Sequence, residues 1–104
     1  MSRRVVKTPQ VYRDVVEFGD FIARDSLAAA IRFAESFDNT CYALGANPSL
    51  GSPWETEDES CAGLFYWPID GFPNHLLFFR PISGGIEILR ICHASGDLTN
   101  ILWA

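Results

Sequence analysis

The 104-residue sequence has no apolar run long enough to cross a membrane. Its purely apolar stretches, such as Leu76–Phe79, fall far short of the roughly 20 residues that a spanning helix needs. Residues 1–10 are basic, but no apolar segment follows them, so the sequence predicts no secretory signal. We therefore expect a cytoplasmic protein that does not associate with membranes.

Basic residues are also few, with eight Lys and Arg against thirteen Asp and Glu and a formal net charge of -5. Proteins that depend on phosphate contacts usually present a basic surface, because their affinity comes from counterion release. A local basic patch could still bind nucleic acid, but the overall field of this chain does not favour it. We expect no direct binding to nucleic acid.

Cysteine is limited to Cys41, Cys61 and Cys92, and no two of them form a CxxC pair. Zinc binding by closely spaced thiolates has no support, and the sequence predicts neither a metal site nor a cofactor. We expect free thiols that are buried or partly buried. Cys92 and His93 do not form a nucleophile–base pair, because neighbouring strand residues point to opposite faces.

Apolar residues, by contrast, make up 48% of the chain and aromatic residues 13%, which excludes disorder. We expect one domain over residues 1–104 that folds without cross-links. The pattern begins with a short strand at residues 3–7 and continues with an amphipathic helix at residues 10–24, capped by Thr8. Three charged residues lie off the apolar stripe of this helix, namely Arg13, Asp14 and Glu17.

A second helix follows, with Asp25 or Ser26 as its N-cap. We expect Gly45 to end this helix in the left-handed conformation, since Asn47-Pro48 prevents continuation. The two helices then form an antiparallel hairpin. The predicted apolar stripe of the second helix contains Ala30, Phe33, Phe37, Cys41 and Leu44, widened by Leu27, Ile31 and Ala34.

The second half of the chain has the pattern of a loop followed by strands. Residues 49–60 predict a solvated acidic loop, and strands are expected at residues 64–69, 75–82 and 86–93. We expect residues 98–103 to form either a short helix or an extended tail. The order β-α-α-β-β-β predicts an α+β fold in which a helical hairpin packs on a small, mainly antiparallel sheet.

Four pieces of the second half occur in an informative order. They are Gly63-Leu64-Phe65-Tyr66-Trp67-Pro68-Ile69, then Gly71-Phe72, then His75–Pro81, and then Gly85–His93 followed by Asp97. Together with the Asn47-Pro48-x-x-Gly51 step, they resemble the RelE/ParE toxin superfamily, the plasmid stabilisation toxins of bacterial type II toxin–antitoxin systems. No single motif is diagnostic, but the order and spacing are fairly specific and span nearly the whole chain. The resemblance implies a RelE/ParE-like fold and a cognate antitoxin as partner.

Two departures from the family pattern distinguish between its branches. Phe65 stands where the family commonly has Arg, and Gly96 stands where an Arg precedes the closing Asp. The RelE branch cleaves messenger RNA in the ribosome, which requires a base, cations for the phosphate charge and a proton donor. The losses point instead to the ParE branch, which the resemblance associates with inhibition of DNA gyrase through protein binding. The sequence therefore predicts no catalytic residue.

Two alternatives remain open. One is a RelE-type ribosome-dependent endoribonuclease, which requires a cationic cluster around the last strand. The other is a degenerate homologue that is not toxic but still binds an antitoxin.

Five residues are candidates for partner binding: Arg80, Arg90, His93, Asp97 and Trp103. If residues 83–85 form a three-residue loop, Ile82 pairs with Ile86 and the two arginines share one face of the hairpin. If the loop is only Gly84-Gly85, they point to opposite faces. Each arginine could instead pair with a local acid such as Glu87, Asp70 or Asp97. His93 could equally act as a hydrogen-bonding group at the strand end, and Asp97 as a cap.

Overall fold

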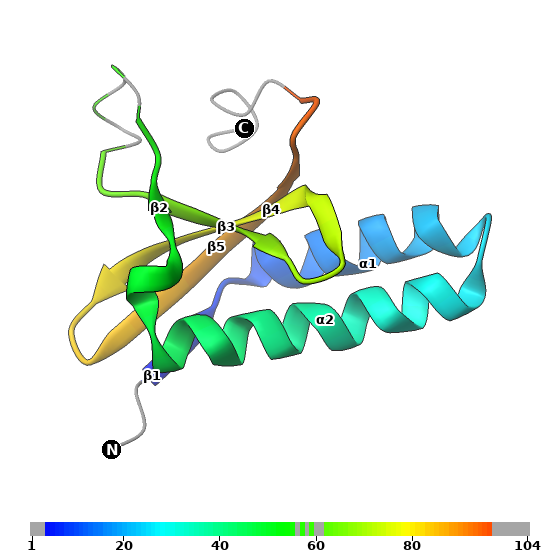
Figure 1. Cartoon of the computed structure of the whole chain (residues 1–104), viewed down its shortest axis with the longest axis horizontal. Coiled ribbons are helices and arrows are strands. Elements are labelled where there is room, and N and C mark those ends of the chain that lie inside the picture. The colour runs from blue at the N-terminus through cyan, green and yellow to red at the C-terminus, as the bar shows by residue number, and fades with distance from the viewer. Residues whose placement is uncertain (1–3, 56, 58, 60–61, 97–104) are drawn as a thin grey trace.

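The computed structural model describes residues 4–55, 57, 59 and 62–96, and Figure 1 shows their arrangement. The chain begins with strand β1 (Arg4–Lys7), followed by helix α1 (Pro9–Ala23) and helix α2 (Leu27–Ala46). A short 3-10 helix, η1 (Pro48–Leu50), leads to strand β2 (Ser52–Pro53). Strands β3 (Phe65–Ile69), β4 (Phe72–Ile82) and β5 (Gly85–His93) complete the described elements.

The strands form one sheet in the order β1-β5-β4-β3-β2. Strand β1 runs parallel to β5, and the other neighbours are antiparallel. The helical hairpin lies along one face of this sheet (Figure 1). The predicted α+β fold is therefore confirmed, with β2 as an additional strand inside the segment expected to be a loop.

The core lies between the hairpin and the sheet. Its larger cluster joins buried side chains of α1, α2 and the sheet: Val11, Phe33, Phe37, Cys41, Leu44, Ile69, Leu77, Phe79, Ile86, Ile88 and Ile91. A smaller cluster is formed by Leu64, Phe78 and Cys92, with Trp54, Tyr66, Leu76 and Leu89 packed against it. Burial of these large apolar side chains, at about 25 cal/mol per Å², stabilises the sheet from both faces.

Both helix starts follow from their caps. The Thr8 hydroxyl accepts a hydrogen bond from the Val11 amide at 3.1 Å, as the sequence predicts. The Ser26 hydroxyl accepts one from the Ala29 amide at 3.1 Å, so Ser26, of the two candidates, is the N-cap of α2.

The expectation for Gly45 is wrong. Gly45 lies inside α2, is buried, and is not among the glycines with positive φ. A Cβ at this position would collide with Cγ2 of Val5, so the residue allows α2 to approach β1 closely. The predicted widening of the apolar stripe by Leu27, Ile31 and Ala34 is also wrong. Leu27 and Ile31 are 68% and 54% exposed, and Ala34 is exposed as well.

The β4–β5 hairpin differs from both predicted turns. Ile82 pairs with Gly85, so the loop is Ser83-Gly84, and Gly84 supplies a φ of 77°. Further along, Phe78 pairs with Arg90 but Phe79 pairs with Ile88, which leaves one extra residue in β5. Such a β-bulge bends the strand and changes the direction of nearby side chains.

No helix among the described residues is long and apolar enough to span a membrane.

Candidate functional site

Arg80 lies on β4 opposite Glu87 of β5. Its Nε donates to Oε1 of Glu87 at 2.7 Å, and the Arg80 side chain is 55% exposed. Glu87 was one of the local acids predicted as its partner. Because the pair is exposed, it contributes only about 0–1 kcal/mol, and another carboxylate can compete for the guanidinium.

Arg90 pairs with an acid that the sequence reasoning missed. Its Nε donates to Oδ2 of Asp14 at 3.2 Å, and its Nη2 donates to Oδ1 at 3.1 Å. The Asp14 side chain is only 2% exposed. This two-point contact raises the pKa of Arg90, with the hydrogen bond to Asp14 as the main cause.

The same carboxylate closes the open edge of β5. Strand β1 ends at Lys7, and Thr8 then continues the pairing through its amide to the Ile88 carbonyl and its hydroxyl to the Leu89 carbonyl. Six residues after Thr8, Oδ2 of Asp14 accepts the Ile91 amide at 2.9 Å. Helix α1 thus satisfies backbone groups that β1 is too short to reach.

A sequence signal for Asp14 existed. It lies three residues after Val11 and four before Phe18, and this spacing places it on the buried side of the helix. The prediction that Asp14 lies off the apolar stripe is therefore wrong. A charged residue at a buried helical position indicates a partner elsewhere in the fold, because an unpaired buried charge is strongly unfavourable.

His93 lies at the end of β5, directly opposite His75 of β4. Its Nδ1 accepts the Ser95 amide at 3.2 Å, and the Ser95 hydroxyl lies 2.6 Å from the same nitrogen. The two imidazole rings are 5.1 Å apart. Burial lowers the pKa of His75, with a further contribution from His93. Both rings line an apolar cavity of about 480 Å³ beside Phe18, Phe21 and Ile22 of α1.

Asp97 and Trp103 lie outside the described residues, so their predicted roles stay predictions. Phe65, which stands in place of a family Arg, stacks on Phe79 with 5.9 Å between ring centroids. It packs against the larger core cluster, so this position serves packing.

The two described cysteines, Cys41 and Cys92, are buried free thiols. Burial raises the pKa of the Cys41 thiol to about 12 and that of the Cys92 thiol to about 11. Within the described part of the chain, no three His, Cys, Asp or Glu side chains are grouped so that they could hold a metal ion.

The architecture is that of a small α+β domain of the RelE/ParE type, with a helical hairpin on a mainly antiparallel sheet. A family model described as the ParE toxin of the type II toxin–antitoxin system, parDE, matches residues 5–98. A comparison with curated proteins finds no match. The match extends over nearly all of the 104 residues, and the chain belongs to the ParE toxin family.

Proposed function

We propose that this toxin inhibits DNA gyrase by binding to it in the cytoplasm, and that a cognate antitoxin neutralises it. The toxin role comes with the family. The observation that supports a binding mode over a nuclease is the state of the two arginines on β4 and β5. Arg80 is held by Glu87 and Arg90 by Asp14, so each guanidinium already has a carboxylate partner.

A nuclease needs cations that meet the developing phosphate charge and a base that takes the 2′-hydroxyl proton. The buried Asp14 carboxylate fixes Arg90 to α1, and at the positions of two family arginines the chain has Phe65 and Gly96. The net charge of -5 also opposes docking on ribosomal RNA. These observations favour a protein target over an RNA substrate.

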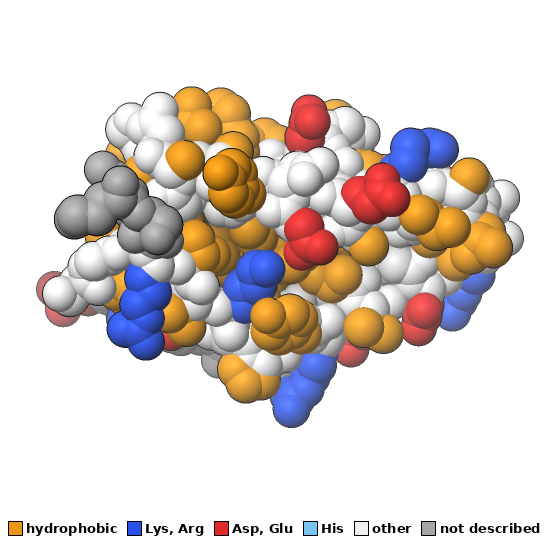
Figure 2. Space-filling model, turned by 90° about the horizontal axis from the view of Figure 1, so that it is seen from below, with side chains coloured by type: hydrophobic (Ala, Val, Ile, Leu, Met, Phe, Trp, Pro, Cys, Tyr) orange, Lys and Arg blue, Asp and Glu red, His pale blue; other side chains and the backbone are white. Residues whose placement is uncertain are grey.

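The outer face of the hairpin offers a surface for the antitoxin. Its exposed apolar side chains belong to α1 and α2 and comprise Tyr12, Val16, Leu27, Ile31 and Tyr42. Figure 2 shows apolar groups on the face seen from below, interspersed with acidic and basic ones. An amphipathic segment of a partner buries such a surface while pairing its charges. Of the five candidate residues, Arg80 is the one we propose for direct contact, since it is exposed and its pair with Glu87 stabilises the protein too little to prevent another carboxylate from competing.

The test combines growth with two biochemical assays. Induction in a bacterial host is expected to arrest growth, and the purified chain is expected to block supercoiling by gyrase. Coexpression of the antitoxin encoded beside the toxin gene should relieve both effects. Message cleavage in a translation extract with supercoiling unaffected would overturn the proposal in favour of an endoribonuclease.

Growth after induction of a double variant distinguishes a gyrase inhibitor from a non-toxic homologue. If wild-type induction is harmless while Phe65→Arg, Gly96→Arg arrests growth, the chain is a degenerate antitoxin-binding protein and the gyrase proposal fails. If wild type and variant are both toxic, arginines at positions 65 and 96 are not needed for toxicity, as inhibition through protein binding predicts.

A further inference from the structure

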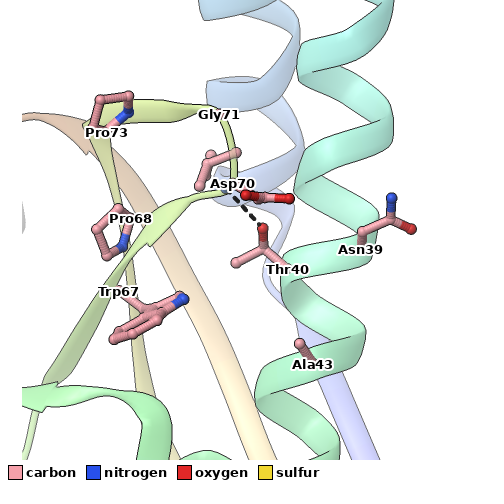
Figure 3. Close-up of a pocket in the computed structure, with 9 residues that line it drawn as sticks. Asn39, Thr40, Ala43, Trp67, Pro68, Asp70, Gly71 and Pro73 are labelled. Atoms are coloured by element: carbon pink, nitrogen blue, oxygen red, sulfur yellow. Dashed lines mark hydrogen bonds between the residues drawn. The ribbon is translucent and has the colours of Figure 1, made fainter.

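A cavity of about 420 Å³ lies between α2 and the turn that joins β3 to β4. Figure 3 shows Thr40 and Ala43 of α2 along one side and Trp67 and Pro68 of β3 along the other, with Asp70 at one end. The volume falls within the roughly 300–1,000 Å³ of typical ligand pockets. None of the functions discussed above involves these residues.

One buried hydroxyl holds the two sides of this cavity together. Thr40 is 4% exposed, and its Oγ1 donates to the Ser36 carbonyl at 2.7 Å. The same oxygen accepts the Asp70 amide at 3.2 Å, a contact drawn as a dashed line in Figure 3. Gly71 completes the turn with a φ of 78°. The cavity is therefore preorganised, which reduces the entropy lost when a ligand binds.

The lining combines two groups that recognise cations. Trp67 presents an indole ring, and Asp70 adds a carboxylate that forms no ion pair with any of the described residues. An indole attracts a cation through its ring quadrupole, and the carboxylate attracts it through charge. The remaining lining is largely apolar and suits the methylene stem of a long basic side chain.

The edge of β3 indicates how such a group enters. Among the described residues, strand β2 pairs only with Phe65 and Tyr66 of β3, and no described strand lies beside the rest of β3 on that side. Pro68 lacks an amide proton, which weakens the addition of a further strand at this edge. A partner therefore reaches the cavity with a side chain instead of a paired backbone.

We propose that this cavity is a recognition pocket for an arginine side chain of a protein partner. Arginine fits better than lysine, because a planar guanidinium both stacks on an aromatic ring and pairs with a carboxylate, and the lining offers one of each in Trp67 and Asp70. The acidic net charge of the chain adds a long-range attraction for a basic segment. The proposal rests on the proposed function only in identifying that partner as the antitoxin.

The test uses small probes that carry only the side chain. N-acetyl-arginine amide and its uncharged isostere N-acetyl-citrulline amide are titrated into the full chain at low salt, and amide and indole N–H shifts are followed by NMR. The arginine probe is expected to shift the Trp67 indole and the Asp70 amide in a saturable manner. The citrulline probe is expected to bind at least about tenfold more weakly, equivalent to about 1.4 kcal/mol.

Two variants and a matched control localise the effect. Asp70→Asn preserves the turn, because Asn suits the same position, and should weaken arginine binding about threefold, in line with an exposed ion pair. Trp67→Leu removes the ring and should weaken binding about fivefold. Asp20→Asn makes the same charge change at an exposed site on α1 and should leave binding unchanged.

Equal binding of both probes overturns the proposal, as does unchanged arginine binding in both Asp70→Asn and Trp67→Leu. These measurements do not involve gyrase, so a chain that binds arginine here but is harmless to cells refutes the proposed function alone. A chain that inhibits gyrase but does not discriminate between the probes refutes only the pocket.

Discussion

Asp14 is the side chain on which the attachment of α1 to β5 depends. It accepts hydrogen bonds from Arg90, from the Ile91 amide and from Gln10, although only 2% of it is exposed. Removing one partner of a buried ion pair destabilises a protein by about 3–5 kcal/mol. An orphaned backbone donor contributes about 1–3 kcal/mol of destabilisation, and the two effects overlap here.

We therefore expect Asp14→Ala to lower the free energy of unfolding by about 4 kcal/mol, out of the about 5–15 kcal/mol typical of a small domain. Asp14→Asn should fall between wild type and Asp14→Ala, because an amide oxygen can still accept the Ile91 amide while the charge is lost. Urea unfolding followed by far-UV circular dichroism measures these differences.

The second arginine–carboxylate pair of the protein, Arg80 with Glu87 in the β4–β5 hairpin, provides a matched control. Glu87→Ala breaks the exposed contact with Arg80 and should change the free energy of unfolding by less than about 1 kcal/mol. If Asp14→Ala and Glu87→Ala are equally mild, the argument that burial makes Asp14 structural is refuted.

Three further outcomes follow from packing and burial. Gly45→Ala should lower the free energy of unfolding by about 1–3 kcal/mol, because the added methyl group collides with β1. Gly19→Ala in α1 has open space around it and should raise the free energy of unfolding by up to about 1 kcal/mol. Thermal unfolding measures both changes. Burial lowers the pKa of His75, so the unfolded chain binds a proton at this side chain at a higher pH than the folded chain does. The free energy of unfolding should therefore fall as the pH drops below 6.5. His75→Phe should reduce this pH dependence, as unfolding curves at pH 7.5 and 5 can show. Cys41 and Cys92 should resist thiol labelling at pH 8 in the native state and react after unfolding, as peptide mass mapping can show; rapid native labelling of either would contradict their burial.

Local signals predicted the elements well. Thr8 before Pro9 predicted the start of α1, and the spacing of Phe33, Phe37 and Cys41 predicted the buried face of α2. These features depend on residues close in the chain, and helix capping and periodicity are short-range effects.

Long-range contacts account for what sequence reasoning missed. The sequence predicts a helix end at Gly45, whereas the structure requires glycine there because of close contact with Val5, which lies forty residues away in the chain. The bulge in β5 likewise depends on pairing between strands, and no local pattern specifies it. Asp14 could be matched to Arg90 only once α1 was placed beside β5. The pairing of Arg80 with Glu87 could be predicted from the sequence, because both residues lie in the β4–β5 hairpin.

The contrast between the two arginines determines how toxin variants should be interpreted. Loss of activity in Arg90→Ala does not identify a contact residue, since the change also leaves the buried Asp14 carboxylate without its guanidinium. Arg80→Ala removes an exposed group and is expected to leave the fold intact. Glu87→Ala keeps Arg80 and releases it from its internal partner. If Arg80 binds a carboxylate of gyrase or of the antitoxin, affinity in a pull-down or calorimetric titration should fall in Arg80→Ala and hold or rise in Glu87→Ala. Equal losses in both variants would mean that the pair only supports the hairpin.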